Sequence, residues 1–140
     1  MVGKKRWAFV SRFISGALIL WTLPWTLLGA VVGLLGLASG GGMQFHSGVL
    51  ECHGGFVTWL LARLPVKPSA LTLGHTVLGC TAAALDLTRR HERIHVRQYE
   101  RWGLLFVPAY LLCSLVPWLR GEDGYRQNRF EREAFEKEGG

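Results

Sequence analysis

The stretch HERIHVRQYERWG, from His91 to Gly103, places two histidines four residues apart with a glutamate directly after the first. Residues four apart in a helix lie on one face, so the imidazoles of His91 and His95 can reach the same metal ion. Glu92 is turned toward the open coordination position, where its carboxylate can take a proton from a metal-bound water. The stretch therefore predicts half of a zinc site, on a helix that runs from about Ala82 and ends at Gly103.

A second interpretation of the same stretch is a solvated basic helix, because Arg89 and Arg93 bring charge into the pattern. A downstream ligand would separate the two interpretations, since a catalytic zinc site uses three protein ligands and one open position. The segment NRFEREAF offers such a ligand on a predicted final helix, Asn128 to Lys137. We prefer Glu131 over Glu133 as the third ligand, because Glu133 can equally face solvent.

Taken together, HERIHV.Q and FEREA resemble motifs of the gluzincin zinc metallopeptidases, in which a glutamate on a later helix completes the site. In the HtpX and CAAX-prenyl-protease group this glutamate begins an E-x-x-A pattern, which matches Glu131 to Ala134. Short bacterial proteins with an HExxHxxQ helix and a FEREA pattern are more similar still. The resemblance implies a minimal zincin-like α+β fold in which His91, His95 and Glu131 bind Zn²⁺ and Glu92 is the general base.

Further residues are candidates for supporting roles around this site. Gln98 lies one turn beyond the second histidine, so we expect it to orient that ligand, with Glu133 beside it; hydrogen bonding on the helix surface is the alternative. Tyr125 can donate its hydroxyl to an oxyanion, and His75 can line the cleft. A packing tyrosine and a strand-surface histidine are the alternatives for these two. Phe135 stands where the HtpX group has an aspartate, so that supporting role has no counterpart here.

The middle of the chain predicts a small β-sheet. MQFHSGVLECHGG alternates in polarity around a Ser-Gly pair, which indicates a hairpin over residues 43–55. FVTWLLARLP is a short helix or strand that ends at Pro65, and SALTLGHTVLG is a strand with a bulge or kink at Gly74. In gluzincins such a strand edges the cleft, so the resemblance implies a peptide or protein substrate bound along strand 70–78.

The N-terminal part predicts a membrane anchor, because a basic start is followed by a run without charge from Phe13 to Ala38. As a helix this run would reach about 39 Å, enough to cross a hydrocarbon layer of about 30 Å. It is longer than the apolar region of a signal peptide, so we expect an uncleaved transmembrane helix, kinked at Pro24. A re-entrant hairpin is the alternative.

A second apolar segment, Leu104 to Leu119, is uncharged but short for a crossing, and Pro108 and Pro117 interrupt it. If Glu131 shares a metal with the two histidines, this segment cannot carry it to the far side of a bilayer. We therefore expect a kinked helix that packs on the domain or enters the near leaflet.

Charge and composition fit this organisation. The net charge is +6 and 49% of the residues are hydrophobic, so we expect membrane lipids and no nucleic acid as partners. Residues 1–42 form the basic N-terminus, transmembrane anchor and glycine linker, and residues 43–140 a minimal metallopeptidase-like domain. The expected location is a bacterial inner membrane. The basic start favours a domain outside, whereas a hairpin anchor would keep it inside. The three widely spaced cysteines are expected to be buried thiols.

The function predicted from the sequence is a membrane-anchored, zinc-dependent metallopeptidase. The main alternative is a non-catalytic membrane protein whose metal site is structural or vestigial and which acts as a binding module. A third hypothesis is a basic lipid-binding protein without a metal.

Overall fold

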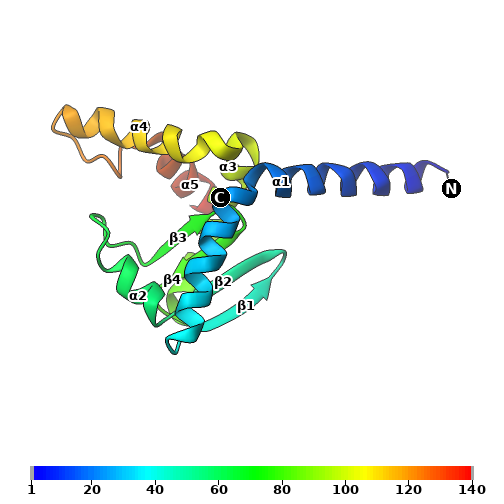
Figure 1. Cartoon of the computed structure of the whole chain (residues 1–140). Coiled ribbons are helices and arrows are strands. Elements are labelled where there is room, and N and C mark those ends of the chain that lie inside the picture. Colours follow the sequence, from blue (N-terminus) through cyan, green and yellow to red (C-terminus); the bar gives the residue numbers. More distant parts are fainter. Residues whose placement is uncertain (1, 140) are drawn as a thin grey trace.

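The computed structural model of the chain describes residues 2–139, which form an α+β fold around one mixed four-stranded sheet with the strand order β1-β2-β4-β3 (Figure 1). The strands are β1 (Gly42–His46), β2 (Val49–His53), β3 (Ala70–Leu73) and β4 (Thr76–Gly79). The helices are α1 (Val2–Ala38), α2 (Phe56–Leu61), α3 (Ala82–Trp102), α4 (Phe106–Leu119) and α5 (Arg129–Gly139), with a 3-10 turn η1 (Gly103–Leu105) between α3 and α4.

The expected hairpin is present, because β1 and β2 pair antiparallel through a tight turn. Ser47 and Gly48 in this turn both have a positive φ, 50° and 79°, as a two-residue hairpin turn requires. The following segment, described from sequence as a short helix or strand, is the helix α2.

The segment expected to be one strand with a bulge at Gly74 is instead a second hairpin. β3 and β4 pair antiparallel, and Gly74 and His75 form the turn between them. Gly74 has a φ of 62°, which suits a glycine, and the polarity of the segment alternates on both sides of it, so the strand pattern alone conceals the turn. β4 is paired on both sides, with β2 and with β3. Of the predicted substrate strand 70–78, only β3 therefore lies at an edge of the sheet.

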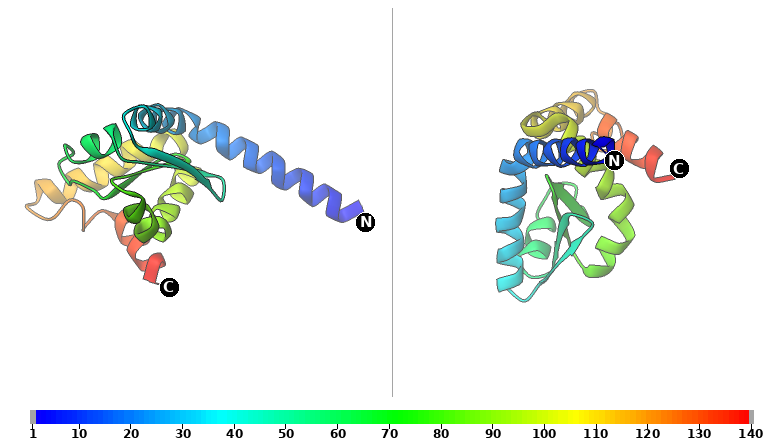
Figure 2. Two further views of the ribbon diagram at one scale, coloured as in Figure 1. Left: turned by 90° about the horizontal axis from the view of Figure 1, so that it is seen from below. Right: turned by 90° about the vertical axis from the view of Figure 1, so that its right-hand side faces the viewer.

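Helix α1 bends sharply, as Pro24 predicts, so that its two halves have different surroundings (Figure 1). The first half projects from the fold, and the second half packs along one face of the sheet (Figure 2). The second half of α1 can approach the sheet and α2 closely because it has glycines at the contact. Gly29 lies against Thr76, Gly33 against Cys52 and Gly36 against Val57. The uncharged run from Phe13 to Ala38 is long and apolar enough to cross a membrane, but part of it covers the sheet. The boundary at residue 42 between the anchor and the metallopeptidase-like domain stays a prediction.

Helix α3 covers the opposite face of the sheet, so that the sheet lies between α1 and α3 (Figure 2). The helix begins and ends as the sequence predicts. The side chain of Thr81 accepts a hydrogen bond from the backbone N–H of Ala84, and Gly103, with a φ of 56°, ends the helix. Apolar side chains fill both sides of the sheet: Cys52, Val57, Leu61 and Leu78 toward α1 and α2, and Val49, Val77, Leu85 and Val96 toward α3.

From Phe106 to Leu119 the second apolar segment is a single helix, α4, and the two prolines do not break it. Pro108 lies in the first turn, where its missing N–H needs no partner, and Pro117 lies in the last turn. Many apolar side chains of α4 remain exposed, among them Leu111, Leu112, Leu119 and Trp118. The stretch from α3 into α4 is a second candidate membrane span by length and composition. Of the three cysteines, which are all free, Cys52 is fully buried and the other two are half-buried.

Candidate metal centre

Three side chains from two helices converge on one buried point. His91 Nε2 lies 3.0 Å from Glu131 Oε2 and 3.2 Å from His95 Nε2. His95 Nε2 lies 3.3 Å from Glu131 Oε1. A tetrahedral ion with bonds of about 2.0 to 2.1 Å holds its ligand atoms about 3.3 to 3.4 Å apart, so the spacing is close to that of a zinc site. Among residues 2–139 these three form a group that could hold a metal ion.

The far nitrogens of both rings face hydrogen-bond acceptors. His91 Nδ1 lies 3.0 Å from Glu138 Oε2, and His95 Nδ1 lies 2.8 Å from Gln98 Oε1. A carboxylate accepts only, so His91 Nδ1 carries the hydrogen in that pair. In the neutral rings both Nε2 atoms therefore present lone pairs toward each other and toward the Glu131 carboxylate. This convergence of acceptors requires a cation or additional protons between them.

The amide of Gln98 is fixed in the orientation that this assignment needs. Its Nε2 donates to Phe130 O and to Glu133 Oε2, both at 3.0 Å, so its oxygen is left for His95. Gln98 is fully buried. Burial alone would raise the pKa of Glu133, but Lys137 and Arg101 outweigh it and lower this pKa to about 2. The two residues predicted to support the site thus form one chain of hydrogen bonds behind His95.

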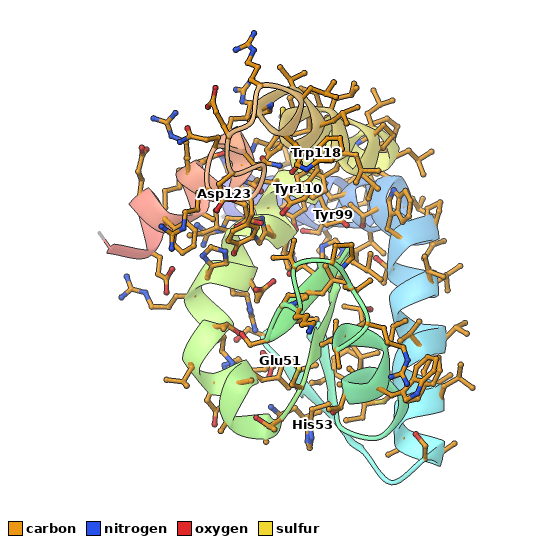
Figure 3. All side chains as sticks on the ribbon, turned by 90° about the vertical axis from the view of Figure 1, so that its left-hand side faces the viewer. Glu51, His53, Tyr99, Tyr110, Trp118 and Asp123 are labelled. Atoms are coloured by element: carbon orange, nitrogen blue, oxygen red, sulfur yellow. The ribbon has the colours of Figure 1, made fainter. Side chains whose placement is uncertain are left out.

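The third ligand candidate is held by α4, a contact that sequence reasoning missed. Tyr110, on α4, donates its hydroxyl to Glu131 Oε1 of α5 at 2.6 Å (Figure 3). Burial would raise the pKa of Glu131, but the adjacent imidazoles of His91 and His95 and the hydrogen bond from Tyr110 outweigh it and hold this pKa well below its usual range. Glu131 is therefore a carboxylate that is oriented for a ligand role.

Asn128 fixes α5, the helix of Glu131, against α4. Its Oδ1 accepts from the backbone N–H of Phe130, and its amide donates to Tyr110 O at 3.0 Å and to Ser114 Oγ at 2.8 Å. Asn128 has no exposed surface. A buried helix-capping residue whose two amide hydrogens both bind the neighbouring helix sets the position of α5 along α4.

Glu92 lies beside the cluster and is bound to the edge strand. Thr72 Oγ1 donates to Glu92 Oε2 at 2.6 Å, and the carbonyl of Thr72 accepts from the hydroxyl of Tyr99. Burial raises the pKa of Glu92, although the histidines and Thr72 oppose it. A buried carboxylate with a raised pKa is a stronger base than an exposed one, which suits the predicted role.

A cavity of about 760 Å³ opens over this cluster. Its lining is mostly apolar and comes from β3, the loop before β3, α3, α4 and the segment before α5. His91, Glu92, His95 and Glu131 face into it, and so does Tyr125, whose pKa is raised by burial and by Glu131.

His75 does not join the cluster. It lies in the β3–β4 turn, where Nδ1 is 2.9 Å from Thr22 Oγ1 of α1 and Nε2 is 2.9 Å from Glu100 Oε1 of α3. His75 is absent from the lining of the cavity over the cluster. This position indicates that His75 links α1 and α3, and it does not support the predicted role in the cleft.

The arginines that favoured a solvated helix have specific partners. Arg89 donates through Nε and Nη2 to the two carboxylate oxygens of Glu51, both at 2.9 Å, and Gln44 donates to the same carboxylate. Glu51 is 1% exposed, so the pair fixes α3 on the sheet. Arg93 reaches the carbonyls of the β1–β2 turn. Both arginines therefore hold the HExxH helix against β1 and β2.

Comparisons with family models, with curated proteins and with solved structures found no match.

Proposed function

We propose that this chain is a membrane-attached zinc metallopeptidase of minimal zincin-like architecture, with His91, His95 and Glu131 as metal ligands. The observation that carries the proposal is the convergence of two imidazole nitrogens and one carboxylate on a single buried point, with ligand atoms 3.0 to 3.3 Å apart. Two imidazoles and a carboxylate with an open side are a donor set that suits zinc. A bound zinc ion would polarise a substrate carbonyl and lower the pKa of its water.

The protein groups around the metal position have defined roles in this proposal. Glu92 takes the proton from the attacking water and passes it to the leaving amine. Thr72 holds one oxygen of Glu92, which leaves the other oxygen for the water. Tyr125, which lines the cavity, is the candidate donor to the developing oxyanion. The peptide substrate would lie in the cavity along the edge of β3.

The test of the metal site is zinc content after purification of the full chain in detergent. We expect one zinc per chain, and we expect His91→Ala and Glu131→Ala to lose it. Glu136→Ala is the matched control, because Glu136 is an exposed carboxylate on the same helix as Glu131. Absence of zinc from the wild type, or unchanged zinc in both ligand variants, would contradict the proposal.

The burial of all three ligand candidates favours one alternative, a structural metal in a non-catalytic binding module, because the exposed fraction of each residue is only 4–7%. Glu92→Gln separates the two functions, because it keeps the shape of the side chain and removes the base. We expect this variant to bind zinc as the wild type does and to lose peptide hydrolysis. Equal rates of hydrolysis with zinc bound would reject the catalytic role of Glu92.

A further inference from the structure

The first half of α1, up to the bend at Pro24, is two-sided. Lys5 and Arg12 lie seven residues apart on one side of the helix, and Ser11, Ser15 and Thr22 share that side at helical spacing. All of these residues except Thr22 are exposed. This side therefore presents positive charge and small polar groups, with Ile19 as an exposed apolar exception near its inner end.

The other side of the same half is apolar and rich in aromatic residues. It carries the following exposed side chains at helical spacing: Trp7, Phe9, Val10, Phe13, Ile14, Leu20 and Trp21. Arg6 is the exception on this side, and its long side chain at the outer end of the helix can reach polar headgroups. A cationic side opposite a Trp- and Phe-rich side is typical of helices that lie in the interface of an anionic membrane.

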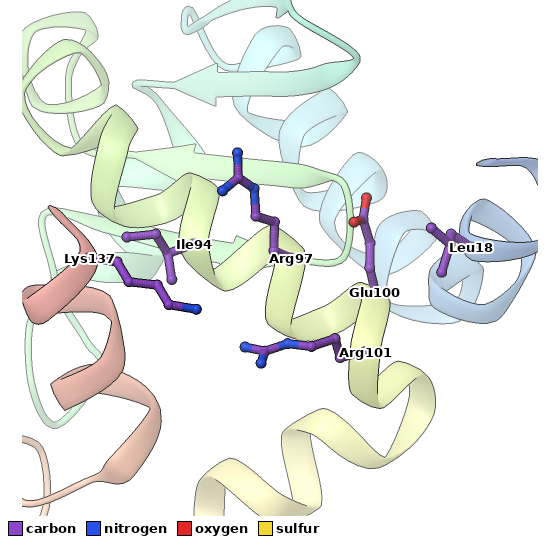
Figure 4. Close-up of a pocket in the computed structure, with 6 residues that line it drawn as sticks. All are labelled: Leu18, Ile94, Arg97, Glu100, Arg101 and Lys137. Carbon is purple, nitrogen blue, oxygen red and sulfur yellow. The ribbon is translucent and has the colours of Figure 1, made fainter. Parts of the chain in front are cut away.

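Contacts with the rest of the fold fix which way the two sides face. Thr22, on the polar side, is fully buried and lies 2.9 Å from His75 of the β3–β4 turn. The polar side therefore meets the domain at Thr22, and the apolar side projects free of it up to Trp21, which packs on Gly103. Arg97 and Arg101 of α3 line a hollow next to Leu18, so further cations lie on the domain side of this half (Figure 4).

A crossing helix would conflict with these charges. The second half of α1 packs on the sheet, so a crossing would have to use the residues before Thr22. Crossing about 30 Å takes about 20 helical residues, which would bring Arg12 and Lys5 into the hydrocarbon. Arg12 would lie near the centre of the hydrocarbon, where a charge is strongly unfavourable, whereas an in-plane helix leaves both charges at the headgroups.

Helix α4 begins where this half of α1 meets the domain. The ring of Trp21 packs on Gly103, and Trp25 Nε1 donates to Leu104 O at 3.4 Å. In Figure 1 the first half of α1 and α4 both run along the upper margin of the molecule, and α4 also exposes apolar side chains. A single lipid surface can therefore touch both helices.

We infer that the first half of α1 lies in the plane of an anionic membrane surface, with its apolar side among the acyl chains, and that it does not cross the bilayer. The two ends of α1 are then on the same side of the membrane. The outward leucines of the second half of α1 form a separate stripe, and nothing in the structure shows what covers it.

The test is a nitroxide scan of the full chain, with its three cysteines replaced, on vesicles of equal parts phosphatidylcholine and phosphatidylglycerol. Labels at Ser11 and Ser15 should collide with a water-soluble nickel complex, and labels at Val10, Ile14 and Ala17 should collide with oxygen in the lipid. Equal protection of both sides from nickel would show a crossing helix and overturn the inference, as would failure to bind the vesicles.

A pair of arginine variants tests how much the positive charge of α1 contributes to membrane binding. Arg12→Gln should weaken binding to these vesicles about fivefold at low salt, and added salt should remove the difference. Arg132→Gln, an exposed arginine on α5, should leave binding unchanged. Equal weakening by both variants would contradict a specific contact of Arg12 with anionic headgroups. The inference goes beyond the proposed function and is independent of zinc, so His91→Ala should give the wild-type nitroxide pattern whether or not the metal site exists.

Discussion

At the scale of single residues, the hydrogen bonds around the candidate metal centre matter as much as the three ligand candidates themselves. Glu131 is held by Tyr110, His95 by Gln98, and Glu92 by Thr72. Each of these bonds orients a group that would otherwise rotate. Their loss should therefore change metal affinity or the pH dependence of the reaction before it changes the fold.

The Tyr110 hydroxyl should contribute to metal affinity. We expect Tyr110→Phe to weaken zinc binding by roughly tenfold or more, because partners that orient metal ligands typically contribute 10–100-fold. Competition with a chromogenic chelator measures this affinity. Leu112→Ala, an exposed change on the same helix, should bind zinc as the wild type does, and an equal affinity in Tyr110→Phe would show that the hydroxyl has no role in ligand orientation.

The hydrogen bond from Thr72 should lower the pKa of Glu92, the proposed general base. Its hydrogen bond favours the charged form of Glu92, so its loss in Thr72→Val should raise the pKa of Glu92. The acid limb of kcat/KM should then move to higher pH, because the carboxylate forms only above its pKa. Thr72→Ser keeps the donor and should restore the wild-type profile. A profile that is the same in all three proteins would contradict the assignment.

At the scale of elements, local motifs predicted much of the candidate site but not its supports. His91, His95 and Glu131 were predicted because helical spacing and a short motif carry them. Tyr110 and Thr72 were missed because each contact joins elements far apart in the chain, and a tyrosine in an apolar segment or a threonine in a strand gives no local signal. Glu138, which faces His91, was missed for the same reason in the charged C-terminal segment.

The ion pair between α3 and β2 should be important for the packing of these two elements. We expect Arg89→Met to lower the free energy of unfolding by about 2–3 kcal/mol, because it leaves the buried Glu51 carboxylate without its charged partner. Urea unfolding in detergent measures this change. The exposed neighbour Arg90→Met is the control, and the double variant Glu51→Gln with Arg89→Met should recover part of the loss.

At the scale of the whole molecule, the two halves of α1 have different surroundings. The first half projects from the fold, and the second half covers one face of the sheet (Figure 2). The sequence predicted a membrane helix and its kink, since uncharged length and a proline are local features. It did not predict that the second half covers the sheet, because apolar side chains facing protein and facing lipid look alike in sequence. The glycines facing the sheet are the feature that distinguishes the two halves in the structure.

Glycine substitutions should separate the two halves of α1. Gly33→Val should destabilise the fold by about 1–3 kcal/mol, because an added side chain would overlap Cys52 of β2. Gly16→Val should be nearly neutral, because a Cβ at Gly16 meets nothing within 4 Å. Thermal unfolding of both variants in detergent measures the difference. Equal effects would indicate that the second half of α1 does not pack on the sheet.

The contact of His75 with Thr22 and Glu100 fixes more than the position of a turn. Because one imidazole joins α1, the β3–β4 turn and α3, the first half of α1 cannot rotate about its own axis without breaking that junction. On the proposed membrane surface, the mouth of the cavity would thereby be held at a set height and tilt above the lipid. The enzyme proposed here would then select peptide bonds by their distance from the bilayer, in addition to the residues beside them.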